Sequence, residues 1–132
     1  MKTTLFALSC LTLFACATVY TPRVFYNYVE VLNQTGGTIN NVDLQIGDSR
    51  NLHCDTVTKK RICYKRFGRH RYPQQPLELS WQDSAGELQA RQLDPPIPAT
   101  LSSGVSARVL LEINADGSVK IEFREDDFSI RS

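Results

Sequence analysis

The chain has 132 residues, 42% of them hydrophobic and 22% charged, and its formal net charge is +1. This length accommodates one domain and excludes two of ordinary size, and the hydrophobic share excludes a disordered chain. The near-neutral total hides an uneven distribution along the sequence. The stretch 50–71 holds eight basic residues and one acid, Asp55, whereas the stretch 78–132 holds ten acids and five bases.

The first sixteen residues follow a pattern of protein export. Lys2 is followed by an apolar run from Leu5 to Ala15, and Cys16 comes directly after the small residue Ala15. This run has about eleven residues, whereas a membrane-spanning helix needs roughly 20, so it does not predict a retained transmembrane segment. A buried core helix and an ordinary secretory signal cut after Ala15 or Ala17 are the other interpretations of this segment.

The ending Leu13-Phe14-Ala15-Cys16 resembles the lipobox of bacterial lipoproteins. The resemblance implies that residues 1–15 are a signal peptide and that Cys16 becomes the lipidated N-terminus. Ala17 is similar to the residue at this position in lipoproteins sorted to the outer membrane, which implies an envelope location facing the periplasm. Residues 16–23 would then be the lipidated cysteine and a linker of at most roughly 25 Å. Such a linker keeps the folded domain close to the membrane.

The remaining chain predicts about seven short strands, because β-branched and aromatic residues alternate with polar ones between turn signals. The expected strands are Val24–Asn33, Ile39–Ile46, Arg61–Phe67, Leu77–Trp81, Glu87–Leu93, Ala107–Asn114 and Val119–Arg124. The turn at Asp116-Gly117 is a strong hairpin signal, and the three prolines of 94–98 exclude a central strand there. Residues 125–132 are expected to form a flexible polar tail.

This pattern predicts an all-β fold in one domain over residues 24–124. The expected architecture is a small antiparallel β-sandwich of immunoglobulin-like or transthyretin-like type, and a small closed barrel is the alternative. Trp81 lies on the apolar side of its strand and is expected in the core. Both remaining cysteines precede it, which differs from the Cys…Trp…Cys order of immunoglobulin domains.

Cys54 and Cys63 are the two cysteines left after processing and lipidation, and an exported protein is expected to join them in a disulfide. His53 and His70 lie in the same region, so a zinc site is the alternative. The four residues form no compact ligand pair, however, and we expect neither a metal nor another cofactor.

The stretch from Lys59 to Arg71 is basic and interleaved with aromatic residues. Because guanidinium groups pair bidentately with phosphates and carboxylates, we expect it to bind an anionic envelope polymer or an envelope protein. The candidate binding residues are Arg61, Lys65, Arg66, Arg69 and Arg71. In an extended strand, Lys65, Phe67, Arg69 and Arg71 would share one face. The alternatives are a solvated edge strand and internal pairing with the acidic C-terminal hairpin, and nucleic acid does not fit an envelope location.

No candidate catalytic residue emerges from the sequence. The carboxylates are scattered, no serine lies in a Gly-x-Ser-x-Gly elbow, and no glycine-rich phosphate loop leads from a strand into a helix. We therefore expect a non-enzymatic envelope lipoprotein that acts as a membrane-anchored binding or assembly module through its basic, disulfide-bounded segment. The alternative is a periplasmic inhibitor of a hydrolase such as lysozyme, which would use the acidic stretch Glu122–Asp127.

Overall fold

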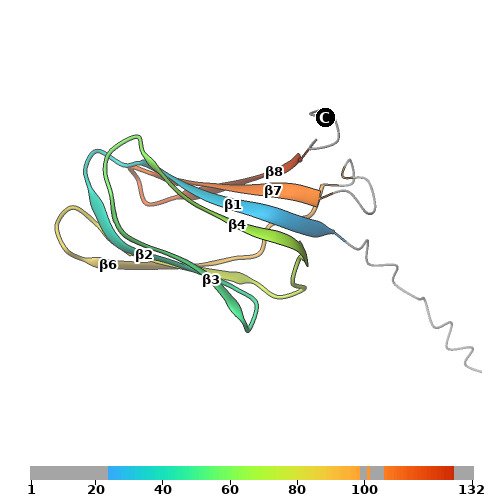
Figure 1. Ribbon diagram of the computed structural model, residues 1–132. Coiled ribbons are helices and arrows are strands. Elements are labelled where there is room, and N and C mark those ends of the chain that lie inside the picture. Colours follow the sequence, from blue (N-terminus) through green and yellow to red (C-terminus); the bar gives the residue numbers. More distant parts are fainter. Residues whose placement is uncertain (1–23, 99–100, 102–105, 127–132) are drawn as a thin grey trace, which may run out of the picture.

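A computed structural model gives the structure of the protein and describes residues 24–98, 101 and 106–126 (Figure 1). The expected signal peptide, Cys16 with its linker, and residues 127–132 of the expected tail lie outside these residues. Within the described ranges, no helix is long and apolar enough to cross a membrane.

The described chain forms eight strands in two four-stranded sheets that pack as a small sandwich (Figure 1). The first sheet has the strand order β4-β1-β7-β8 and the second has the order β3-β2-β5-β6. Neighbouring strands are antiparallel except β1 and β7, which are parallel. The strands are β1 Phe25–Gln34, β2 Ile39–Ile46, β3 Arg50–Val57, β4 Ile62–Arg71, β5 Leu77–Gln82, β6 Leu88–Leu93, β7 Ser106–Asn114 and β8 Val119–Glu125.

The prediction of an all-β sandwich is therefore confirmed. The immunoglobulin constant-type fold divides seven strands into sheets of four and three, whereas both sheets of this sandwich have four strands. The expected number of about seven strands is one too low, because the sequence pattern missed β3. In that strand Asn51, His53 and Asp55 face solvent, and Asn and Asp have low β-propensity.

The core lies between the sheets and consists of the alternate residues along the strands that face inward. On β7 the buried residues are Ala107, Val109, Leu111 and Ile113, and on β5 they are Leu77, Leu79 and Trp81. Trp81 is 1% exposed, which confirms its expected place in the core. The alternation leaves the intervening residues of these strands on the outer faces.

The connections fall at two opposite ends of the sandwich. The loops β1–β2, β3–β4, β5–β6 and β7–β8 lie together at one end (Figure 1). The beginning of β1 lies at the other end, with the β2–β3 turn and the end of β4 (Figure 1). The segment that leads back to Cys16 therefore enters at the end where Phe25 pairs with Arg71.

Candidate functional site

The outer face of the first sheet carries most of the cations that strands present to solvent; we call it the basic face. The register gives its side chains, because paired residues point to the same side of a sheet. Its cations are Arg66, Arg69 and Arg71 on β4, Arg108 on β7, and Lys120 and Arg124 on β8. Its acids are Glu30, Glu112 and Glu122. The face is therefore cationic overall.

A bulge in β4 decides which basic residues reach this face. Tyr26 pairs with His70 and Tyr28 with Arg66, so three β4 residues stand opposite Asn27 alone. Gly68, in the middle of the three, has a φ of 74°, a conformation that glycine adopts without steric cost. The bulge shifts the alternation by one residue, and Arg69 consequently follows Arg66 on the outer face.

The expectation that Lys65, Phe67, Arg69 and Arg71 share one face is wrong for this reason. Lys65 pairs with the core residue Val29 and faces the inner side at the sheet edge. Its Nζ donates to the carbonyl of Asn51 on β3 at 3.5 Å and lies 5.1 Å from the Phe67 ring centroid. Phe67 itself packs against the core.

Arg61 lies apart from the other candidate binding residues. It ends the exposed turn between β3 and β4, where its amide donates to the carbonyl of Thr58 at 3.1 Å. Its carbonyl accepts from the amide of Asn33 at 3.0 Å. The five candidates thus occupy three places: the turn for Arg61, the inner edge for Lys65, and the basic face for the remaining three.

An aromatic cluster anchors the arginines of the basic face. Tyr28 points outward yet is only 4% exposed, because Tyr64 stacks on it at 5.7 Å between ring centroids. The guanidinium carbons of Arg66 and Arg108 lie 5.5 and 4.3 Å from its ring centroid, and cation–π attraction holds guanidinium groups over such faces. Arg69 lies in the same way over Phe25, at 4.2 Å.

The hydroxyl of Tyr28 donates to the carboxylate of Glu30 at 2.8 Å. Burial, followed by this carboxylate, raises the pKa of Tyr28 to about 12. The phenol therefore stays neutral and keeps donating throughout the physiological range. Sequence reasoning missed Tyr28 and Arg108 as members of the site. The only available signal for Arg108 was its outward position in the alternation around Val109.

Cys54 and Cys63 form the expected disulfide, which connects β3 in the second sheet to β4 in the first. The two histidines lie elsewhere. His53 faces outward between Asp43 and Asp55, with both ring nitrogens 2.8 Å from a carboxylate oxygen. His70 Nε2 donates to the carbonyl of Phe67 at 2.7 Å. Within the described residues no group of three or more His, Cys, Asp or Glu is arranged to hold a metal ion.

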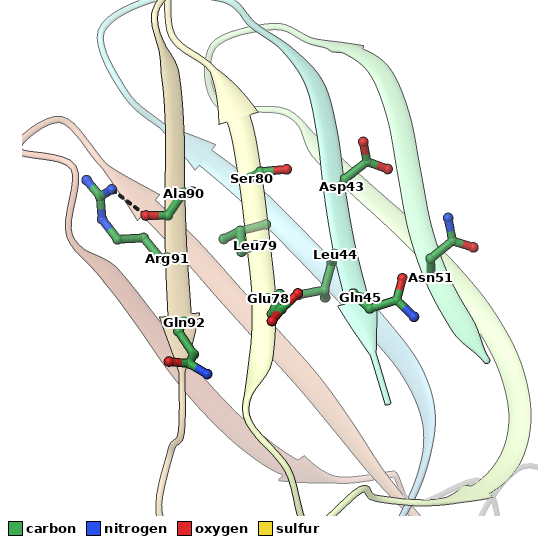
Figure 2. Close-up of a pocket in the computed structure, with 10 residues that line it drawn as sticks. All are labelled: Asp43, Leu44, Gln45, Asn51, Glu78, Leu79, Ser80, Ala90, Arg91 and Gln92. Carbon is green, nitrogen blue, oxygen red and sulfur yellow. Dashed lines mark hydrogen bonds between the residues drawn. The ribbon is translucent and has the colours of Figure 1, made fainter. Parts of the chain in front are cut away.

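The outer face of the second sheet has a different chemistry. It contains an open hollow of about 480 Å³, at whose middle the small residues Ser80 and Ala90 pair across β5 and β6 (Figure 2). Carboxylates and amides surround them, and among the described residues no aromatic side chain lines the hollow. Its outward polar residues are Asp43, Gln45, Asn51, Glu78 and Gln92. The sandwich therefore presents a cationic, aromatic face on one side and an acidic, amide-rich face on the other.

No family model matches the chain, and no curated protein matches it. A similar solved structure is an NMR structure of a protein from Eubacterium rectale, with a TM-score of 0.48 and 13% sequence identity. The match covers 77% of this chain and 91% of that chain.

Proposed function

We propose that this protein is a non-enzymatic binding or assembly module of the bacterial envelope that docks an anionic partner on its basic face. The observation that carries the proposal is the composition of β4. Ile62 and Tyr64 are 45% and 56% exposed, and they point to the same side as Arg66, Arg69 and Arg71. Exposed aromatic and aliphatic residues beside arginines are typical of the central contacts of protein interfaces.

The tether is part of the proposal. A lipid on Cys16, as the lipobox resemblance implies, would hold the domain by residues 17–23, which reach at most roughly 25 Å. Because Phe25 pairs with Arg71, the end of β4 that carries Arg69 and Arg71 would lie nearest the membrane. Ile62 and Tyr64, at the other end of β4, would then face a partner farther from the membrane.

The test is a charge reversal on the full-length protein in its own envelope. The variant Arg69→Glu/Arg71→Glu should lose the partner that the unchanged protein retains after chemical crosslinking and purification. The matched control is Lys59→Glu/Lys60→Glu, which makes the same change in net charge on the β3–β4 turn. Loss of the partner in both variants, or in neither, would contradict docking on the basic face. Circular dichroism of both variants establishes that the fold is intact.

The hydrolase-inhibitor alternative is favoured by one observation, the acidic hollow of the second sheet. Lysozymes are cationic, and the hollow presents to such a partner the carboxylate of Glu78 beside that of Asp43, whose Oδ1 lies 2.8 Å from His53 Nδ1. The stretch Glu122–Asp127 is a weaker candidate, because Glu122 pairs with Arg124 at 2.9 Å and Asp126 accepts from Asn27 at 2.7 Å. The alternative requires a stoichiometric loss of lysozyme turnover that the variant Asp43→Asn/Glu78→Gln removes.

A further inference from the structure

Two arginines from different strands converge on one tyrosine ring of the basic face. Arg66 lies on β4 and Arg108 on β7, and β1, which carries Tyr28, runs between these strands. Both guanidinium carbons lie over the Tyr28 ring, at 5.5 and 4.3 Å from its centroid. The arrangement depends on the strand order of the sheet, because Arg108 is far from the basic segment in the sequence.

The surroundings hold these two guanidinium groups in place. Tyr28 is buried beneath them, and its hydroxyl is fixed by the hydrogen bond to Glu30. Tyr64, which stacks on Tyr28, forms an exposed aromatic wall beside Arg66. A ligand that binds here meets side chains whose rotamers are already restricted, and less conformational entropy is lost on binding.

We propose that Arg66 and Arg108 together bind a phosphate group above Tyr28. Each guanidinium is a planar fork of N–H donors that matches phosphate oxygens bidentately. Two forks, carried by the strands on either side of β1, suit the several oxygens of a phosphate group better than the two of a carboxylate. The inference rests on the proposed function, since it names the ligand chemistry of the same face.

Arg69 extends the site along β4. Its guanidinium carbon lies 4.2 Å from the Phe25 ring centroid, which repeats the contact of Arg66 with Tyr28. Two arginines anchored in this way on the edge strand suit a ligand that carries more than one phosphate. Both a soluble polyphosphate and the head groups of an anionic phospholipid surface have this chemistry.

Glu30 opposes such a ligand. Its carboxylate accepts the Tyr28 hydrogen bond at 2.8 Å, so a negative charge lies beside the ring over which the two arginines lie. Removing its charge with Glu30→Gln should therefore strengthen phosphate binding, while the amide oxygen still accepts from the Tyr28 hydroxyl. Because the expected effect is a gain in affinity, it could not result from the loss of a contact that stabilises the fold.

The experiment measures binding of tripolyphosphate, and separately of phosphatidylglycerol vesicles, by the folded protein at physiological salt. Arg108→Gln should weaken binding by about tenfold, as expected for the loss of a charged bidentate contact. Lys120→Gln removes the same charge from the same face and should weaken binding less than about twofold, since exposed charges are screened. Glu30→Gln should tighten binding.

The outcomes separate this site from the broader proposal. Equal effects of Arg108→Gln and Lys120→Gln, unchanged affinity in Glu30→Gln, or no binding of either probe by the unchanged protein would overturn the phosphate site. If the Arg69/Arg71 reversal still removed a protein partner from crosslinked envelopes, the proposed function would stand without it. Arg108-dependent binding of vesicles but not of tripolyphosphate would support the site and identify lipid head groups as the phosphate source.

Discussion

Cys54 and Cys63 join an edge strand of one sheet to an edge strand of the other. β3 and β4 follow each other in the chain but belong to different sheets, and residues 58–61 connect them at one end of the sandwich. The disulfide crosses between the sheets within these strands, with 6.2 Å between the two Cα atoms. β4, which carries half of the cations of the basic face, is thereby fixed to the second sheet as well as to β1.

Removing this link should lower stability without abolishing the fold. The variant Cys54→Ser/Cys63→Ser is expected to lose roughly 2–3 kcal/mol in the free energy of unfolding, because the disulfide closes a short loop in the unfolded chain. Urea unfolding measures the difference. Reductant should destabilise the unchanged protein by a similar amount and leave the double-serine variant unaffected. Equal stability of the two proteins under oxidising conditions would contradict the structural role of the bond.

Gly68 should be sensitive to substitution although it has space around it. An added Cβ would meet nothing within 4 Å, but the φ of 74° disfavours any other residue. Gly68→Ala should therefore cost about 1–2 kcal/mol. Gly36 is equally open and does not have a positive φ, so Gly36→Ala is the matched control and should be nearly neutral. Similar unfolding midpoints for both variants would show that the β4 bulge does not need glycine.

Asn33 should be important for the turn that carries Lys59, Lys60 and Arg61. It is 0% exposed, and its side-chain amide donates to the carbonyls of Gly37 and Val57, both at 2.9 Å. Asn33→Ala removes the side-chain donor to Val57, whereas the Gly37 carbonyl still accepts from the Thr35 hydroxyl at 2.9 Å. The change should cost about 1–3 kcal/mol, the range for one buried group left unsatisfied.

The control for Asn33 is its exposed neighbour on the same strand, and Gln34→Ala should change the free energy of unfolding by less than about 0.5 kcal/mol. Chemical denaturation of both variants makes the comparison. A small effect of Asn33→Ala would mean that water replaces the lost donor.

His53 should titrate above its ordinary range. Hydrogen bonds to Asp43, and then to Asp55, raise the pKa of His53 above 6.5. Because the folded-state pKa is raised, protonated His53 stabilises the protein fully below a pH of about 6.5. This contribution is lost as the pH rises through the folded-state pKa.

The NMR titration of the His53 imidazole ring measures this directly. Asp43→Asn should lower the pKa of His53, because it removes the carboxylate that contributes most to the raised pKa. A pKa at or below 6.5 for His53 in the unchanged protein would show that the two carboxylates do not hold the ring in solution.

Strands with clear alternation could be predicted from the sequence, and those shaped by tertiary contacts could not. Ile39–Ile46 is found with the expected bounds, because Val42, Leu44 and Ile46 alternate with polar residues throughout. β3 was missed because its outward residues are poor strand formers, and pairing with β2 is what makes it a strand. The expected strand Arg61–Phe67 corresponds to β4 but ends too early, because the regular alternation stops before Gly68. The bulge at Gly68 allows the strand to continue to Arg71.

The candidate site was predicted in composition but not in geometry. The basic character of 61–71 is visible in the sequence. Which face of the sheet each of its side chains points to depends on the bulge opposite Asn27, which the sequence does not reveal. Arg108 could not be connected with Arg66 at all without the strand order, because β1 brings them together around Tyr28. Cross-strand contacts of this kind depend on the topology and leave no local signal.

The most direct test of docking on the basic face is site-specific photo-crosslinking in the native envelope. A photoreactive phenylalanine at position 64 replaces a tyrosine that is 56% exposed on this face. The same residue at position 88 replaces Leu88, which is 72% exposed on the opposite sheet. Crosslinking of a partner from position 64 and not from position 88 is the predicted result. Equal crosslinking from both positions, or crosslinking from position 88 alone, would contradict the account.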